Sequence, residues 1–137
     1  MSHAERGSTA VTIVILTPTV VVLMLFVVFL GRLSATENDV RGAARDAARA
    51  ASLRGTIDGA SQAALSTAAA TLEARDVSCA TLDVTTVVDN DAIAPLVRVT
   101  LRCSVSTQDL TGLNVPGVRT VTATAAEPLD VHRGARP

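Results

Sequence analysis

The chain has 137 residues, with 12 basic and 13 acidic side chains and a formal net charge of -1 at pH 7. The charges are balanced and the arginines are scattered, which argues against nucleic acid as a partner. The only aromatic residues are two Phe, so a core must be built from Val, Leu, Ile and Ala, and the length outside the apolar segment allows one small domain.

An apolar segment near the N-terminus predicts a membrane-spanning helix. After a short head, residues 1–7, no charged residue occurs from Ser8 to Leu30. About twenty apolar residues are what a helix needs to cross the roughly 30 Å of a bilayer core. We therefore assign residues 8–31 to a single transmembrane helix in contact with membrane lipid. A cleaved secretory signal, the main alternative, has a shorter apolar region and a small-x-small site.

Pro18 lies inside this segment and predicts a bend in the transmembrane helix, because proline lacks a backbone donor. The hydroxyl of Thr17 or Thr19 is expected to bond the carbonyls that Pro18 leaves free. The arginines on the two sides of the segment do not decide its orientation. A short head and a cysteine-containing tail favour an N-terminus inside the cytoplasmic membrane and a C-terminal domain outside it.

Residues 32–76 predict a helical stalk that continues the transmembrane helix. The stretch 32–54 is rich in Ala and Arg, which are strong helix formers. Gly55 and Gly59 bracket a break, with Asp58 as the candidate cap of a second helix over residues 60–75. One stripe of mostly small apolar side chains and one row of arginines recur at helical spacing. The stripe comprises Leu33, Val40, Ala44, Ala47 and Ala51, and the row Arg41, Arg45 and Arg49.

Residues 77–127 predict a small three-stranded antiparallel sheet, followed by a mobile tail, residues 128–137. Apolar residues alternate with polar ones from Ala80 to Asp89 and from Val97 to Val105, and a third strand is expected from Val118 to about Ala125. Val87 is the one apolar residue on the polar side of its strand. Turns are expected at 89–95 and 112–117. The predicted fold class is therefore α+β.

Cys79 and Cys103 are the only cysteines and predict one disulfide, which would matter most in a small domain with a thin core. Pairing the inward faces sets Leu82 opposite Leu101, and this register sets Cys79 opposite Ser104. The bond then requires Cys79 to lie off the strand ladder, in a loop or bulge. It also requires an oxidising compartment.

Motifs that carry catalysis or bind cofactors are absent from the sequence. The only histidines, His3 and His132, stand in the terminal tails, so no nucleophile and base pair and no zinc spacing is visible. Asp89 and Asp91 lack the partners of a calcium loop and indicate a hairpin turn. We expect neither enzymatic activity nor a cofactor.

Two segments resemble TadE-like proteins, which are similar to minor pilins. Arg6 and Gly7 precede an uncharged run with an internal proline, and VRGAARDAARAASLRG, residues 40–55, is similar to the family's Ala/Arg helix after the membrane. The resemblance implies a pilin-like fold and cleavage by a prepilin peptidase between Gly7 and Ser8. Thr12 stands five positions beyond that cut, where such proteins commonly carry Glu.

The resemblance implies a structural role, that of a minor pseudopilin in a tight-adherence pilus system. Such a protein is anchored in the cytoplasmic membrane, contacts pilus or secretion-apparatus subunits, and reaches the cell surface if it enters the pilus. The alternative is a permanently anchored extracytoplasmic binding module that never enters a filament. Retention of the leader would favour this alternative.

Overall fold

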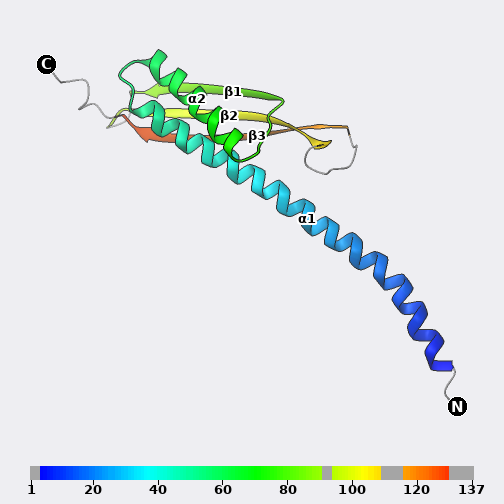
Figure 1. Cartoon of the computed structure of the whole chain (residues 1–137). Coiled ribbons are helices and arrows are strands. Elements are labelled where there is room, and N and C mark those ends of the chain that lie inside the picture. Colours follow the sequence, from blue (N-terminus) through cyan, green and yellow to red (C-terminus); the bar gives the residue numbers. More distant parts are fainter. Residues whose placement is uncertain (1–3, 91–93, 109–115, 130–137) are drawn as a thin grey trace. The chain divides into compact units, whose positions relative to one another are not determined.

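The computed structural model describes the backbone of residues 4–90, 94–108 and 116–129, and the side chains of residues 12 onward within these ranges. The element order is α1 (Ala4–Ser52), α2 (Ile57–Ala74), β1 (Thr81–Asp89), β2 (Leu96–Ser106) and β3 (Val118–Pro128). Figure 1 shows these elements. The predicted α+β class is confirmed. The expected turns at 89–95 and 112–117 fall partly, and the tail 128–137 mostly, outside the described residues.

The chain divides into two units, Met1–Ser34 and Ala35–Pro137. The first holds the apolar part of α1. The second, called the domain below, holds the rest of α1, α2 and the sheet. Since α1 has no break from Ala4 to Ser52, the predicted continuation of the apolar helix into the Ala/Arg segment is confirmed.

The sheet is an antiparallel meander with the order β1-β2-β3. Neighbouring strands pair antiparallel, and period-two alternation gives each strand one apolar side. β2 is the central strand, and its inward residues Val97, Val99, Leu101 and Cys103 are fully buried. Val87 is exposed, as its position in the alternation predicts.

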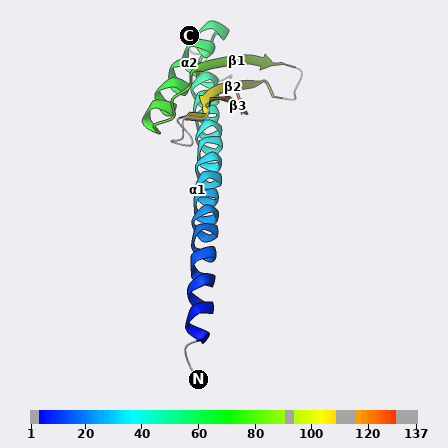
Figure 2. The same cartoon turned by 90° about the vertical axis from the view of Figure 1, so that its right-hand side faces the viewer.

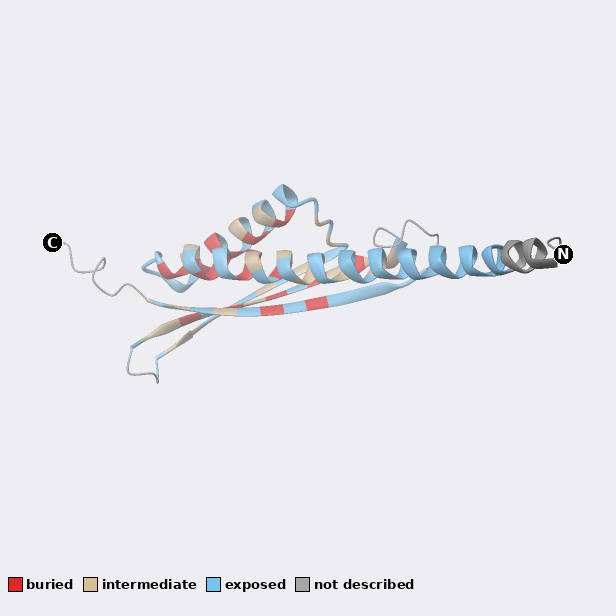
Figure 3. Ribbon diagram, turned by 90° about the horizontal axis from the view of Figure 1, so that it is seen from below, coloured by how far each residue is buried: buried red, intermediate tan, exposed pale blue. Residues whose placement is uncertain are grey.

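Helices cover one face of the sheet and leave the other open (Figures 2 and 3). α2 packs against β1. Alanine supplies ten of the eighteen buried apolar residues in the described part of the chain, nine of them from the helices. Small side chains let helix and sheet backbones approach closely, but each buries little area, so the core is thin. The predicted stripe lies in this core except Leu33, which is half-buried.

The register predicted for the first hairpin is wrong by two residues. Leu82 lies opposite Cys103, not Leu101, and Val84 lies opposite Leu101. A slip of two residues keeps every side chain on its face, so the apolar pattern alone does not distinguish the two registers. The contacts of the folded hairpin select between them.

The N-cap of α2 is Thr56, not Asp58. The Thr56 hydroxyl accepts a hydrogen bond from the Gly59 N–H at 3.2 Å. Both residue types are good caps, but Thr56 has the extended backbone that a cap requires. Asp58 lies in the first turn instead, where its charge favours the positive end of the helix dipole.

The C-terminus of α2 is closed by paired backbone hydrogen bonds. The Val77 N–H donates to the Leu72 carbonyl at 3.0 Å and the Asp76 N–H to the Glu73 carbonyl at 3.1 Å. This is the Schellman arrangement, and it holds Asp76 at a φ of 56°. A left-handed conformation is unfavourable for Asp and costs Gly nothing.

We therefore expect Asp76→Gly to raise the free energy of unfolding by about 0.5–1 kcal/mol. The matched control is Asp58→Gly, the same exchange inside a helical turn, which should lower it by about 0.5–1 kcal/mol. Thermal unfolding of the two variants in detergent measures both. Equal destabilisation by the two changes would contradict this account of the helix end.

The Thr86 hydroxyl oxygen is buried without a hydrogen-bond partner in the described part of the chain. Burial without a bond costs about 1–3 kcal/mol, and valine has nearly the same shape without the polar atom. Thr86→Val should therefore stabilise the domain by about 1 kcal/mol, whereas Thr85→Val on the exposed side should not. Denaturant unfolding of the two variants distinguishes them. A loss of stability in Thr86→Val would contradict the view that the buried Thr86 hydroxyl lacks a hydrogen-bond partner.

Candidate membrane anchor and disulfide-bonded domain

The apolar part of α1 is the one candidate membrane span among the described residues. Its large side chains, from Ile13 to Leu30, are exposed rather than packed in the protein, except that of Phe29, which is half-buried (Figure 3). A helix that is apolar all round needs an apolar solvent, and an α-helix satisfies its own backbone there. This segment therefore has the properties of a single-pass membrane anchor.

The threonines beside Pro18 bond the backbone one turn back. Thr17 Oγ1 donates to the Ile13 carbonyl at 2.7 Å and Thr19 Oγ1 to the Ile15 carbonyl at 3.2 Å. The carbonyl that loses its donor to Pro18 is that of Val14. The hydroxyls therefore bond the carbonyls on either side of it, which corrects the expectation that they replace the missing bond. The bend at Pro18 stays a prediction.

Two acidic residues near the start of the domain tie α1 to the other elements. Glu37 Oε1 accepts a hydrogen bond from Arg119 of β3 at 3.2 Å, and its other oxygen lies 3.8 Å from Arg41. Asp39 Oδ1 accepts one from Arg75, just after α2, also at 3.2 Å. All are partly exposed, so each pair contributes at most about 1 kcal/mol. Their main effect is to set how α1 lies against β3 and α2.

Gly42 makes room for one of these ion pairs. A Cβ at this position would lie 2.8 Å from Nη1 of Arg75. The guanidinium of Arg75 therefore crosses α1 directly over Gly42 on its way to Asp39. Sequence reasoning gave no role to Gly42, because only the packing of α2 beside α1 brings Arg75 to it.

The cysteines form the Cys79–Cys103 disulfide, with their Cα atoms 5.3 Å apart. Cys79 precedes β1, off the ladder. The Ala80 N–H donates to the Ser104 carbonyl at 2.7 Å, although the ladder pairs Ser104 with Thr81. This irregular start moves Cys79 away from Ser106, the residue that the regular register would set opposite it, and lets it reach Cys103.

A groove of about 450 Å³ opens beside the disulfide and is lined by the end of α2 and the start of β1. Leu72, Val77 and Leu82 form its apolar side, and Glu73 and Asp76 its polar rim. Cys79 is half-buried in this wall, whereas Cys103 is fully buried. The described side chains contain no group of three or more His, Cys, Asp or Glu placed to hold a metal ion.

The remaining predicted site lies at the N-terminus. Gly7 and Ser8 fall within the bounds of α1, but their side chains are outside the described part of the chain. Cleavage between them therefore stays a prediction. His3 and His132 are also outside the described residues.

These features define a class: a single-pass anchored protein whose apolar helix continues into a small disulfide-bonded α+β domain. The family model described as TadE-like protein matches residues 7–49. This match confirms the resemblance seen in the sequence and covers α1 almost completely. The match indicates a component associated with Tad-type pili. Members of this family have structural roles in pilus assembly. Neither the curated proteins nor the solved structures contain a match to the chain.

Proposed function

We propose that the chain is a minor pseudopilin of a Tad-type pilus-assembly system, anchored with its N-terminus inside and its domain outside the cytoplasmic membrane. The observation that carries this proposal is the extent of the family match. Residues 7–49 include both the apolar anchor and the part of α1 that forms the core of the domain, where Val40, Ala44 and Ala47 are buried. The matched segment therefore belongs to both units: it forms the apolar helix of the first and part of the core of the second.

The contacts of the domain support a structural role. α1 supplies six of the buried core residues, and arginines from β3 and from the residue just after α2 bond to it. The disulfide adds a covalent tie from the segment between α2 and β1 to the central strand. The partners are then pilus or secretion-apparatus subunits, and the mechanism is binding.

Processing by a prepilin peptidase is the sharpest part of the proposal. Cleavage after Gly7 would expose a new N-terminus at Ser8. The test is intact mass and N-terminal sequencing of the chain from native membranes, with a Gly7→Leu variant to block the cut. Gly55→Leu, in the turn between the helices, is the matched control, since nothing lies within 4 Å of a Cβ there. A native chain that begins at Ser8, and a Gly7→Leu chain that keeps its leader, are expected.

Thr12 favours a second candidate function. A buried acidic residue at this position would be retained in a membrane only if paired, for example with a neighbouring subunit's N-terminus, and Thr12 cannot form that ion pair. The chain would then be a permanently anchored extracytoplasmic binding module. An uncut native chain absent from purified pili selects this candidate. Free thiols in the native protein would contradict an extracytoplasmic domain in either case.

A further inference from the structure

The two ends of the disulfide differ in how far they are buried. Cys103 is fully buried on the central strand, whereas Cys79 is half-buried. Cys79 also lines the groove of about 450 Å³ at the end of α2, and Cys103 does not. A thiol exchanges with a disulfide only if it reaches one of the two sulfurs. An attacking thiol therefore reaches this bond from the groove, at Cys79.

The backbone next to Cys79 is open to pairing with another chain. The Val77 N–H is used by the end of α2 and the Ala80 N–H by the central strand. In the described part of the chain, no backbone hydrogen bond joins Ser78 or Cys79 to another segment. An extended segment of a partner can add its own backbone hydrogen bonds to such a stretch. The accessible cysteine thus lies in a stretch that an extended segment can bind.

The groove offers apolar area to a protein partner. Leu72, Val77 and Leu82 form its apolar side. Leu72 is buried below the surface, and the other two are partly exposed. A small thiol covers little of this area, whereas a protein that inserts side chains into the groove removes it from water. The groove therefore favours a protein over a small thiol.

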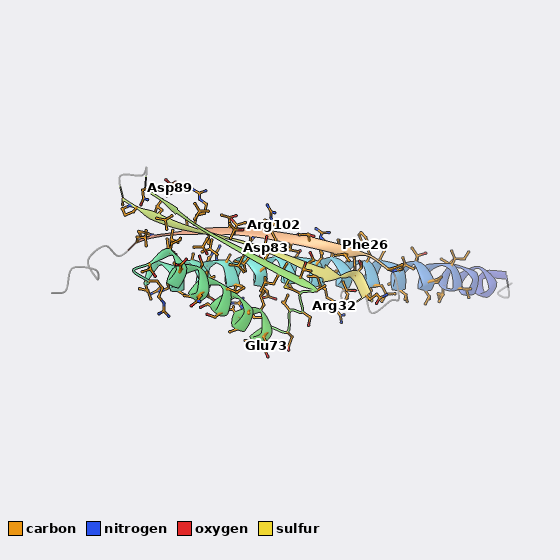
Figure 4. All side chains as sticks on the ribbon, turned by 90° about the horizontal axis from the view of Figure 1, so that it is seen from above. Phe26, Arg32, Glu73, Asp83, Asp89 and Arg102 are labelled. Carbon is orange, nitrogen blue, oxygen red and sulfur yellow. A yellow bond between two sulfur atoms is a disulfide. The ribbon has the colours of Figure 1, made fainter. Side chains whose placement is uncertain are left out.

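Two carboxylates at the rim of the groove act in the same direction. Glu73, labelled in Figure 4, and Asp76 have no arginine within 4.0 Å among the described side chains. Arg75 stands between them in the sequence, but its guanidinium bonds to Asp39 of α1 instead. The charge at the rim therefore opposes an anionic small thiol such as glutathione.

We propose that this groove is the docking site of a thiol–disulfide oxidoreductase, which exchanges with the bond through Cys79. A second copy of the chain is not the occupant that this chemistry fits, because the folded chain has no free cysteine with which to exchange. The inference goes beyond the proposed function but rests on the extracytoplasmic location in it, where such enzymes form disulfides.

The exchange balances with the enzyme's two cysteines as the only other reactants. One enzyme thiolate bonds to Cys79 Sγ, the Cys79–Cys103 bond breaks, and Cys103 leaves as a thiolate that takes up a proton. The second enzyme thiolate attacks the sulfur of the first and releases Cys79 in the same way. The enzyme is then oxidised to its disulfide and the chain is reduced to two thiols. The oxidised enzyme forms the bond by the reverse steps, in which Cys103 displaces the enzyme from Cys79.

Trapping the mixed disulfide identifies the exchanging sulfur. The probe is reduced thioredoxin with its second active-site cysteine replaced by alanine, mixed with the folded full-length chain in detergent. After an acid quench, the free thiols are alkylated in denaturant and mass spectrometry of peptides locates the link. We expect links to Cys79 at least about tenfold more often than to Cys103, and similar links to both in urea-unfolded chain. Equal links in the folded chain, a link mainly to Cys103, or no link overturns the proposal.

Filling the groove tests docking separately from access. Ala69 and Ala70 are both exposed on α2, but only Ala69 lines this groove. Ala69→Phe should slow reduction by intact thioredoxin about tenfold and reduction by neutral dithiothreitol less than about twofold. Ala70→Phe is the matched control and should change neither rate, and circular dichroism checks that both variants are folded. Equal slowing of both reagents would mean that the new side chain only shields the sulfur, and it would overturn docking, as would equal effects of the two variants.

The failure of this inference can be told apart from failure of the proposed function. Both experiments use the purified chain, so they do not depend on its location. If they fail while the cysteines of the chain from native membranes are oxidised, the proposed location stands and the docking site is rejected. Free thiols in that native chain would instead contradict the location, and with it the encounter with such an enzyme.

Discussion

Replacing both cysteines by alanine is expected to lower the free energy of unfolding by about 3–4 kcal/mol. The bond closes a loop of sequence separation 24, and a loop of that size restricts the unfolded chain by about 3.5 kcal/mol. Loss of the buried Cys103 sulfur adds to this figure. Small domains have only about 5–15 kcal/mol in total, so the reduced domain should be close to unfolding.

Denaturant unfolding of the detergent-solubilised chain, with and without reductant, measures this effect. Reductant should destabilise the wild-type chain and leave the Cys79→Ala/Cys103→Ala variant unchanged. A loss below about 1 kcal/mol would contradict the view that the alanine-rich core depends on the disulfide. The dependence is physically reasonable, because nine of the buried residues are helix alanines that bury little area.

Leu101→Ala is expected to cost about 3 kcal/mol, within the range of about 2–5 kcal/mol for buried leucines. Leu101 is the largest fully buried side chain and lies at the centre of β2, opposite Val84 and Ala123 on its two neighbours. The alanines of the same core have side chains too short to extend into the cavity that the substitution leaves. The variant should therefore lose stability without losing its secondary structure.

Leu65→Ala is the matched control, since Leu65 is 49% exposed on α2. It should cost less than about 1 kcal/mol. Thermal and denaturant unfolding of both variants, followed by far-ultraviolet circular dichroism, compare them. A similar loss in the two would mean that the inner face of β2 is not the centre of the core.

The periodicity of the sequence predicted most elements of the fold. Apolar residues at helical spacing and the lack of a helix breaker through residues 32–52 predicted that α1 is continuous, and alternation predicted three strands in the order observed. Each rule acts over a few neighbouring residues, so it can be read from the sequence alone. The family resemblance was equally local, as it rested on the leader, the apolar run and the Ala/Arg helix.

Only the tertiary structure decided the features that join distant parts of the chain. Arg75 and Asp39 are 36 residues apart, and Arg119 and Glu37 are 82 apart, and no local rule pairs them. The hairpin register is undetermined by alternation, since a slip of two residues preserves both faces. The sequence by itself determined the apolar helix, the order of the elements and the resemblance to TadE-like proteins, because these depend on neighbouring residues, while packing decided the register and the ion pairs.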